Sequence, residues 1–274
     1  MSANTVSANT MSANTAVANS RGGRLLAVDQ VSSGYVKGVK TINRCSLTVD
    51  EGEIVGVLGA NNAGKTTLIR TITGSLPVWE GTVELGGTDV SGETAERITR
   101  RGVGVALEGR RIFGSLTVEE NLLLPAPSKR NGSKKENRER RRQLLADIYD
   151  VMPDLWRHRT SSGQALSGGQ QQMLAIGRAL MVEPQLLILD EPSLGLSPRF
   201  TEHVVDLLRS INDRYQMAIL MAEQLVWIAS EVSSKVYVMD GGRLGPARPR
   251  GTWNEHDLSN AYLGERTDDA EVGQ

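Results

Sequence analysis

The sequence Gly59-Ala60-Asn61-Asn62-Ala63-Gly64-Lys65-Thr66 fills the pattern G-x-x-x-x-G-K-[ST] and follows the apolar run IVGVL at residues 54–58. A strand, a glycine-rich loop and a helix start in this order form a phosphate-binding loop. The backbone N–H groups of such a loop converge on an anion, and the helix N-terminus adds the positive end of its dipole. Lys65 supplies a cation for the outer phosphates, and the Thr66 hydroxyl can bind a magnesium ion. The segment therefore predicts a site for a nucleoside triphosphate.

The residues after the loop support this interpretation over a chance glycine-rich turn. Residues 67–72 continue as an amphipathic helix, and Gly74 stands where a left-handed C-cap would end it. A helix in this place is what the phosphate-loop pattern requires.

A second apolar run, LLIL at residues 186–189, ends in the acids Asp190 and Glu191. Continuous hydrophobicity is typical of a strand buried on both faces of a parallel sheet. At the carboxyl end of that strand Asp190 can hold magnesium through water, and Glu191 can orient or deprotonate the water that attacks the terminal phosphate. Alternatively, the two acids merely begin a turn with Pro192, but the phosphate loop makes the nucleotide interpretation stronger.

Residues 166–170, LSGGQ, precede the apolar helical pattern of residues 171–180. Ser167 and Gln170 predict a capping box, so a well-capped core helix is one interpretation. The amides of Gly168 and Gly169 carry no side chains, and with the Ser167 hydroxyl they predict a second anion site at the helix start. A chain with one phosphate loop does not obviously need such a site.

Together these segments resemble the ATP-binding subunit of an ABC transporter over about residues 25–264. The resemblance implies a dimer in which the serine-glycine-glycine helix of one subunit closes on the ATP held by the other. It also implies roles for the matching positions. Tyr35 corresponds to the aromatic residue that stacks on adenine. Residues 59–67, of which Thr67 is the last, correspond to the phosphate loop, and residues 166–170 correspond to the family motif. Asp190 and Glu191 correspond to the magnesium ligand and the catalytic acid.

Further segments resemble the branched-chain amino acid importer group, with the urea importer group next. These segments are EGRRIF at 108–113, LTVEENL at 116–122, EPSLGLSP at 191–198, EQ at 223–224 and AYLG at 261–264. In this group the loop glutamine of other ABC proteins is often an acid, here Glu108, and the switch histidine is often a glutamine, here Gln224. Both replacements are therefore compatible with catalysis.

Three positions depart from the usual motifs. Ala60 stands in place of a proline and Asn62 in place of a glycine in the phosphate loop, and Gln170 replaces the glutamate common in the amino acid group. Asparagine is the side-chain-bearing residue that best tolerates a positive φ. We therefore expect ATP binding to survive these changes.

Composition sets the broad class. The chain has 274 residues, of which 39% are hydrophobic and 23% charged, enough for one substantial α/β core. No run approaches the roughly 18 apolar residues of a membrane helix, so partner chains must do any membrane work. The formal net charge of −1 argues against nucleic acid as a partner. The single cysteine, Cys45, suits a reducing compartment and is expected to fill the core.

We predict a P-loop NTPase of the ABC cassette type, with a layered, mostly parallel α/β sheet and a helical subdomain at about residues 108–182. An antiparallel β patch at residues 25–49 and 81–85 is expected to cover the adenine side. The Ser-Ala-Asn-Thr repeats in residues 1–24 predict a disordered tail, and residues 265–274 a C-terminal tail. The basic tract 125–142 precedes an expected helix from Gln143 to Met152 and is interpreted as a solvated linker with a charged helix face, the alternatives being contact with acidic lipid headgroups or nucleic acid.

The function expected from the resemblance is ATP hydrolysis, with ATP and Mg²⁺ bound, at the cytoplasmic face of the cell membrane. The partners implied are a sister ATP-binding subunit, two membrane permease subunits and, indirectly, an extracytoplasmic solute-binding protein. Branched-chain amino acids are the leading solute and urea or a short amide the alternative. A soluble ABC ATPase is the other hypothesis, although the chain has neither a second cassette nor an inserted coiled coil.

Overall fold

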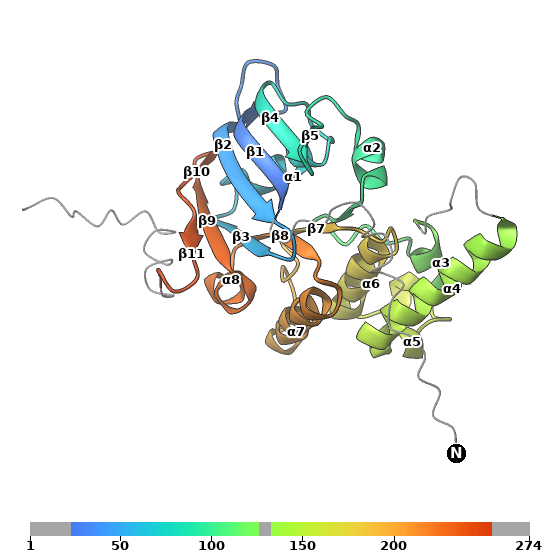
Figure 1. Ribbon diagram of the computed structural model, residues 1–274. Coiled ribbons are helices and arrows are strands. Elements are labelled where there is room, and N and C mark those ends of the chain that lie inside the picture. The colour runs from blue at the N-terminus through green and yellow to red at the C-terminus, as the bar shows by residue number, and fades with distance from the viewer. Residues whose placement is uncertain (1–22, 126–132, 254–274) are drawn as a thin grey trace, which may run out of the picture.

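A computed structural model describes residues 23–125 and 133–253 of the chain (Figure 1). The predicted N-terminal tail, apart from its last two residues, and the predicted C-terminal tail lie outside these ranges, as does the AYLG motif at 261–264. The division into residues 1–24, 25–264 and 265–274 therefore stays a prediction. None of the helices in the described ranges has both the length and the apolar composition needed to cross a bilayer.

A seven-stranded sheet forms the centre of the molecule, in the order β10-β9-β3-β8-β7-β6, with β11 also pairing with β9. Its strands are β3 (Ile54–Gly59), β6 (Val103–Ala106), β7 (Leu186–Asp190), β8 (Ala218–Glu223), β9 (Lys235–Asp240), β10 (Arg243–Leu244) and β11 (Arg248–Pro249). The pairs β9–β3, β3–β8, β8–β7 and β7–β6 are parallel. Every residue of β3, β7 and β8 is buried, which explains their continuous apolar sequences. The predicted parallel core is confirmed.

A four-stranded antiparallel sheet lies above the central sheet in Figure 1, with the strand order β2-β1-β4-β5. Its strands are β1 (Arg24–Ser33), β2 (Ile42–Asp50), β4 (Glu80–Leu85) and β5 (Thr88–Asp89). This is the antiparallel patch that the sequence predicts. Cys45 lies fully buried in β2, and burial raises the pKa of its thiol, so the residue fills the core as expected.

Helix α1 (Lys65–Ile72) packs against both sheets, because it contacts β1 as well as β3, β7 and β8. Its apolar residues join the side chains of β1, β2 and β4 in one buried cluster. Gly74 follows the helix with φ of +69°, as its predicted place beyond the helix end requires. Helix α2 (Ala95–Arg100) contacts the sheet edge at β6.

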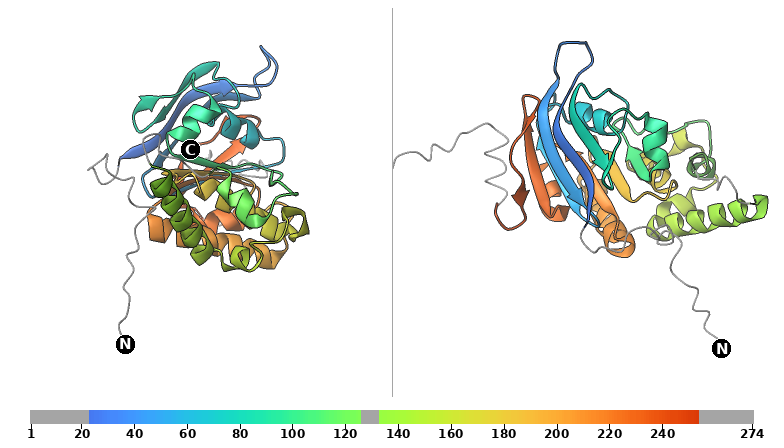
Figure 2. Two further views of the ribbon diagram at one scale, coloured as in Figure 1. Left: turned by 90° about the vertical axis from the view of Figure 1, so that its right-hand side faces the viewer. Right: turned by 45° about the horizontal axis from the view of Figure 1, so that its top comes forward.

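The opposite face of the central sheet carries α6 (Gly168–Leu180), α7 (Pro198–Tyr215) and α8 (Val226–Val232) (Figures 1 and 2). Helices α3 (Val118–Leu123), α4 (Lys134–Val151) and α5 (Pro153–Arg157) extend this layer, and a 3-10 turn at Gly163–Ala165 precedes α6. Helices α3 and α5 contact α6, and α4 contacts α3, α5 and α7. Helices α3 to α6 fall within the predicted helical subdomain, whose boundaries at 108 and 182 remain a prediction, whereas α7 and α8 follow it in the chain.

Helix α4 is longer than the sequence pattern predicts. The apolar pattern suggested a helix from Gln143 to Met152, whereas α4 begins at Lys134. Ser133 and Glu136 form a capping box, with Ser133 Oγ accepting from the Glu136 N–H at 3.2 Å, and the Lys, Arg and Glu residues that follow are good helix formers. Arg140 from this basic stretch pairs with the buried carboxylate of Glu183. Residues 134–142 therefore belong to α4, which agrees with the charged helix face expected for this tract but not with a linker at these residues.

Candidate nucleotide-binding site

The loop between β3 and α1 has the backbone geometry of a phosphate-binding loop. Gly64 adopts φ of +111° directly before α1, and a Cβ atom there would lie 2.8 Å from Met239 Cε. Glycine is thus favoured by the backbone conformation, whereas the end of the flexible Met239 side chain could shift away from a Cβ atom. Asn62 adopts φ of +67°, which agrees with the expectation that asparagine replaces glycine at a left-handed position.

Lys65 lies buried beneath this loop and contacts the predicted catalytic acid. Its Nζ donates to the carbonyl oxygens of Gly59 at 2.7 Å and Ala60 at 3.0 Å, and lies 2.9 Å from Glu191 Oε1. An ammonium group has three protons, so these three acceptors satisfy it. The side chains of Lys65 and Glu191 are 3% and 10% exposed, so the ion pair is largely shielded from solvent.

Glu191 occupies a strained backbone conformation. Its φ is +50°, which costs a non-glycine residue on the order of 1–3 kcal/mol. Its backbone N–H donates to the carbonyl of Ala222 at 2.9 Å, and its side chain is held by Lys65. The surrounding structure thus directs the Glu191 carboxylate toward the phosphate loop.

Asp190 stands at the end of β7 and has one unused acceptor. Thr66 Oγ1 donates to Asp190 Oδ1 at 3.2 Å, while the buried Oδ2 has no hydrogen-bond partner among the described residues. Burial raises the pKa of Asp190 to about 6, opposed by the Thr66 hydrogen bond and strengthened by the charges of Glu191 and Glu108. An unsatisfied carboxylate oxygen beside a hydroxyl fits a divalent cation.

This metal site would be incomplete without substrate. Within the described ranges, no cluster of three or more His, Cys, Asp or Glu residues could hold a metal ion by itself. Thr66 and Asp190 supply two oxygen ligands, and Mg²⁺ typically takes its remaining ligands from water and nucleotide phosphates. The donor set is therefore that of a metal that enters with its nucleotide.

The parallel strands bring the remaining predicted catalytic residues to the same edge of the sheet. Glu108 follows β6 and is exposed, and its charge contributes to the raised pKa of Asp190. Gln224 follows β8, the strand between β3 and β7, and is half-buried. The carboxyl ends of four adjacent parallel strands thus carry the phosphate loop, Gln224, the two acids and Glu108.

Tyr35 lies in the connection between β1 and β2, with 54% of its surface exposed. Its hydroxyl accepts from Arg70 Nη1 at 3.1 Å and is 3.4 Å from Thr67 Oγ1. These contacts place the ring beside α1, the helix that begins at the phosphate loop. The sequence analysis did not identify Arg70, although the spacing of Thr67 and Arg70 puts both on one face of a helix.

Ser167 and Gln170 form the predicted capping box at the start of α6. Gln170 N donates to Ser167 Oγ at 3.3 Å, and Ser167 N donates to Gln170 Oε1 at 3.0 Å. Among the hydrogen bonds of the described residues, none joins residues 167–170 to the phosphate loop. Helices α1 and α6 pack in different buried clusters on opposite faces of the central sheet (Figure 1). The structure therefore does not bring the two predicted anion sites of this chain together.

The glycines of this motif also have a packing role that the sequence did not reveal. A Cβ atom on Gly169 would lie 2.2 Å from the ring of Phe200, and one on Gly168 would lie 3.0 Å from the Arg110 guanidinium. Arg110 donates to Gln171 Oε1 at 3.3 Å. The first turn of α6 is therefore covered by α7 on one side and by the segment after β6 on the other.

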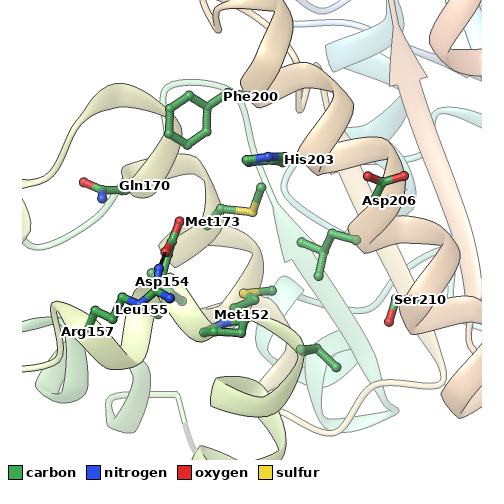
Figure 3. Close-up of a pocket in the computed structure, with 13 residues that line it drawn as sticks. Met152, Asp154, Leu155, Arg157, Gln170, Met173, Phe200, His203, Asp206 and Ser210 are labelled. Carbon is green, nitrogen blue, oxygen red and sulfur yellow. Dashed lines mark hydrogen bonds and ion pairs between the residues drawn. The ribbon is translucent and has the colours of Figure 1, made fainter.

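A groove of about 450 Å³ separates α5 from α7 beside this motif (Figure 3). Phe200, His203 and Asp206 of α7 line one side, and Asp154 and Arg157 of α5 the other. Of the predicted nucleotide-binding residues it contains only Gln170. The groove is therefore a seam between helices, separate from the phosphate loop.

Comparison with known proteins identifies the class of protein that this site defines. The family model described as "ABC transporter" matches residues 42–194. The branched-chain amino acid transport ATP-binding protein BraG of Pseudomonas aeruginosa is 36% identical over 220 residues, which cover 80% of this chain and 91% of BraG. The chain belongs to the ATP-binding subunits of ABC transporters, a family that hydrolyses ATP.

Two further comparisons give a second relative and a solved structure of the same fold. The lipopolysaccharide export system ATP-binding protein LptB of Haemophilus influenzae is 29% identical, covering 88% of this chain and 98% of LptB. A dimeric ATP-binding cassette solved with ADP and phosphate has a TM-score of 0.72 at 21% identity, covering 84% of this chain and all of that one. The predicted ABC cassette fold is confirmed.

We expect the Lys65–Glu191 ion pair to behave as a coupled unit. Lys65→Ala leaves the Glu191 carboxylate buried without its cation, so the free energy of unfolding should fall by roughly 3 kcal/mol. Lys65→Ala/Glu191→Gln removes that charge and should be less destabilised than the single variant. Urea denaturation measures both values. Destabilisation of the double variant that equals the sum of the two single variants would contradict the pairing.

Asp190 should make the metal-free protein less stable as the pH rises. Its folded pKa of about 6 exceeds its ordinary value of 3.8, so between these values the folded state binds more protons than the unfolded state. This contribution to stability is fully present below pH ~4 and is lost as the pH rises to ~6, a change on the order of 2–3 kcal/mol. Chemical denaturation without magnesium, compared with Asp190→Asn, measures it. An equal slope in the variant would contradict the assignment, since its asparagine side chain cannot titrate.

Proposed function

We propose that this chain is the ATP-hydrolysing subunit of an importer of branched-chain amino acids, acting with Mg²⁺ at the cytoplasmic face of the cell membrane. The observation that carries the catalytic part is the meeting of Lys65, Thr66, Asp190 and Glu191 at one edge of the parallel sheet. The solute assignment is supported by the similarity to BraG, whose name states branched-chain amino acid transport.

The geometry supports a specific order of events at the phosphate loop. In this structure Lys65 donates to the two loop carbonyls and pairs with Glu191. A triphosphate in the loop offers Lys65 a stronger anionic partner, so Lys65 turns to the β- and γ-phosphates and releases the Glu191 carboxylate. Glu191 can then accept a hydrogen bond from water at the γ-phosphate. Substrate binding thus frees the catalytic base.

In the chemical step the water oxygen bonds to the γ-phosphorus, and the bond from that phosphorus to the bridging oxygen breaks. Glu191 takes the proton of the water, and ADP leaves with the electron pair of the broken bond. The Gln224 amide can donate a hydrogen bond to the γ-phosphate. Thr66 and Asp190 would hold Mg²⁺, which supplies charge neutralisation at the β- and γ-oxygens. Glu108 would contribute at the outer side of this site.

The separation of the LSGGQ motif from the phosphate loop supports dimerisation with a sister ATP-binding subunit. The N–H groups at the start of α6 have no intrahelical acceptors, and with the Ser167 hydroxyl they can bind a phosphate held by another subunit. Tyr35 would stack on the adenine of the nucleotide in its own subunit. Two membrane permease subunits and an extracytoplasmic solute-binding protein would complete the importer.

Replacing the Glu191 carboxylate by its isosteric amide should separate binding from chemistry. Glu191→Gln removes the base and should slow hydrolysis at least ~100-fold. ATP binding should persist or tighten, because Lys65 is no longer held by a carboxylate. ATPase assays and nucleotide titrations measure the two effects, and size-exclusion chromatography with ATP should show accumulated dimer. Near wild-type turnover would remove Glu191 from the catalytic role.

Uptake by a deletion strain tests the solute. A strain lacking this gene should lose high-affinity uptake of radiolabelled leucine, isoleucine and valine, and the wild-type gene should restore it, whereas the Glu191→Gln gene should not. Radiolabelled urea tests the alternative importer group, and outer-membrane lipopolysaccharide is measured because of the similarity to LptB. Unchanged amino acid uptake would contradict the proposed solute while leaving the ATPase assignment intact.

A further inference from the structure

Glu223 is a buried carboxylate at the end of the strand next to the catalytic one. It is the last residue of β8, lies directly before Gln224, and is 1% exposed. No Lys, Arg or His in the described ranges forms an ion pair with it. A carboxylate at this depth is costly unless hydrogen-bond donors surround it. Its donors therefore indicate what the residue holds in place.

Those donors come from two different loops. Glu223 Oε1 accepts from the Ser193 N–H at 3.0 Å, and Oε2 accepts from the Ser193 hydroxyl at 2.9 Å. Oε2 also accepts from the Gln224 N–H at 3.0 Å and lies 3.5 Å from the Leu225 N. Ser193 is two residues beyond Glu191. One carboxylate thus joins the loop of the catalytic acid to the loop of Gln224.

This junction lies where the sheet ceases to hold the two strands together. The parallel ladder of β7 and β8 ends at the pair Asp190 and Ala222, and the Glu191 N–H donates to the Ala222 carbonyl. Beyond this pair β7 ends, whereas β8 continues to Glu223, which still pairs with Leu58 of β3, and both chains then continue as separate loops. The Glu223 carboxylate links the two chains by hydrogen bonds just beyond the last pair of the β7–β8 ladder. It can therefore determine the distance between the Glu191 and Gln224 side chains.

A simple helix cap does not account for all of these contacts. The Gln224 and Leu225 N–H groups precede α8, so a carboxylate beside them would stabilise the start of that helix. The two bonds from Ser193 serve no such purpose, because Ser193 belongs to the loop after β7. Burial raises the pKa of Glu223, and the hydrogen bonds from Ser193, Gln224 and Leu225 lower it. The contacts to both loops thus favour the charged form.

We infer that Glu223 is a positioning residue for ATP hydrolysis, which holds the Gln224 backbone against the loop that follows Glu191 so that the Gln224 side chain reaches the terminal phosphate. The inference rests on the roles proposed above for Glu191 and Gln224. Glu223 does not itself touch the nucleotide. It acts through Gln224, and the loss of its acceptor atoms changes turnover by releasing that residue.

The decisive experiment is a double-mutant cycle of Glu223→Gln and Gln224→Ala. The glutamine keeps the size of the side chain but replaces one acceptor oxygen by an amide nitrogen that cannot accept. Turnover at saturating ATP should fall about tenfold, the effect of losing one charge-assisted hydrogen bond. ATP affinity should stay within about twofold, because the phosphate loop is unchanged. In the Gln224→Ala background, Glu223→Gln should add less than about twofold.

Two serine variants complete the test. Ser193→Ala removes only the hydroxyl bonded to Oε2 and should lower turnover about threefold, again only while Gln224 is present. Ser233→Ala is the matched control, since Ser233 is also buried but its hydroxyl has no hydrogen-bond partner among the described residues. It should leave turnover unchanged. Thermal melting of each variant reports folding, and if Glu223→Gln does not fold, the Ser193→Ala pair decides the question.

The outcomes separate this inference from the proposed function. If the fold-losses of turnover in Glu223→Gln and Gln224→Ala multiply in the double variant, Glu223 does not act through Gln224. This result would overturn the inference but not the proposed function. Full turnover in a folded Glu223→Gln variant would overturn it as well. Wild-type turnover in Gln224→Ala by itself would contradict the proposed role of Gln224, and the inference would fall with it.

Discussion

The parallel pairing of β3, β8, β7 and β6 is the constraint on which the rest of this structure depends. Parallel strands end at the same edge of a sheet, so residues from distant parts of the chain meet there. Lys65, Glu108, Asp190 and Gln224 are brought together in this way. The antiparallel sheet and the helical layer cover the faces of these strands, and their apolar residues keep the strands buried and the edge in register.

At this edge, the charged side chains differ in how they are satisfied. Lys65 is paired with Glu191, and Asp190 has a raised pKa because it is buried with one oxygen unsatisfied. Such a site favours a ligand that brings phosphate oxygens for Lys65 together with a cation for Asp190. The arrangement of these three side chains thus supports the proposed binding of a nucleotide together with its metal ion. The Glu223 carboxylate, one strand away, is satisfied without a cation, because it accepts hydrogen bonds from two loops.

Some features could be predicted from the sequence because they depend on neighbouring residues. The phosphate loop, the acids that end β7, the capping box of Ser167 and Gln170 and the tolerance of Asn62 for positive φ all arise from local backbone geometry. The capping box of Ser133 and Glu136 is also local and indicates where α4 begins, whereas the apolar pattern alone does not reveal this start. Glu223 carried a signal too, since it is an acid at the end of an apolar run, as Asp190 is.

The sequence by itself determined the kind of chemistry, because spacing within a strand, a loop and a helix start decides which groups can bind phosphate. Only the tertiary structure decided which partners these groups have. The ion pair of Lys65 with Glu191, the packing of Phe200 on Gly169, and the contact of Ser193 with Glu223 all join segments whose distance in space cannot be obtained from their separation in sequence. The physical reason is that burial and close packing are properties of the folded chain as a whole, whereas a motif records only local geometry.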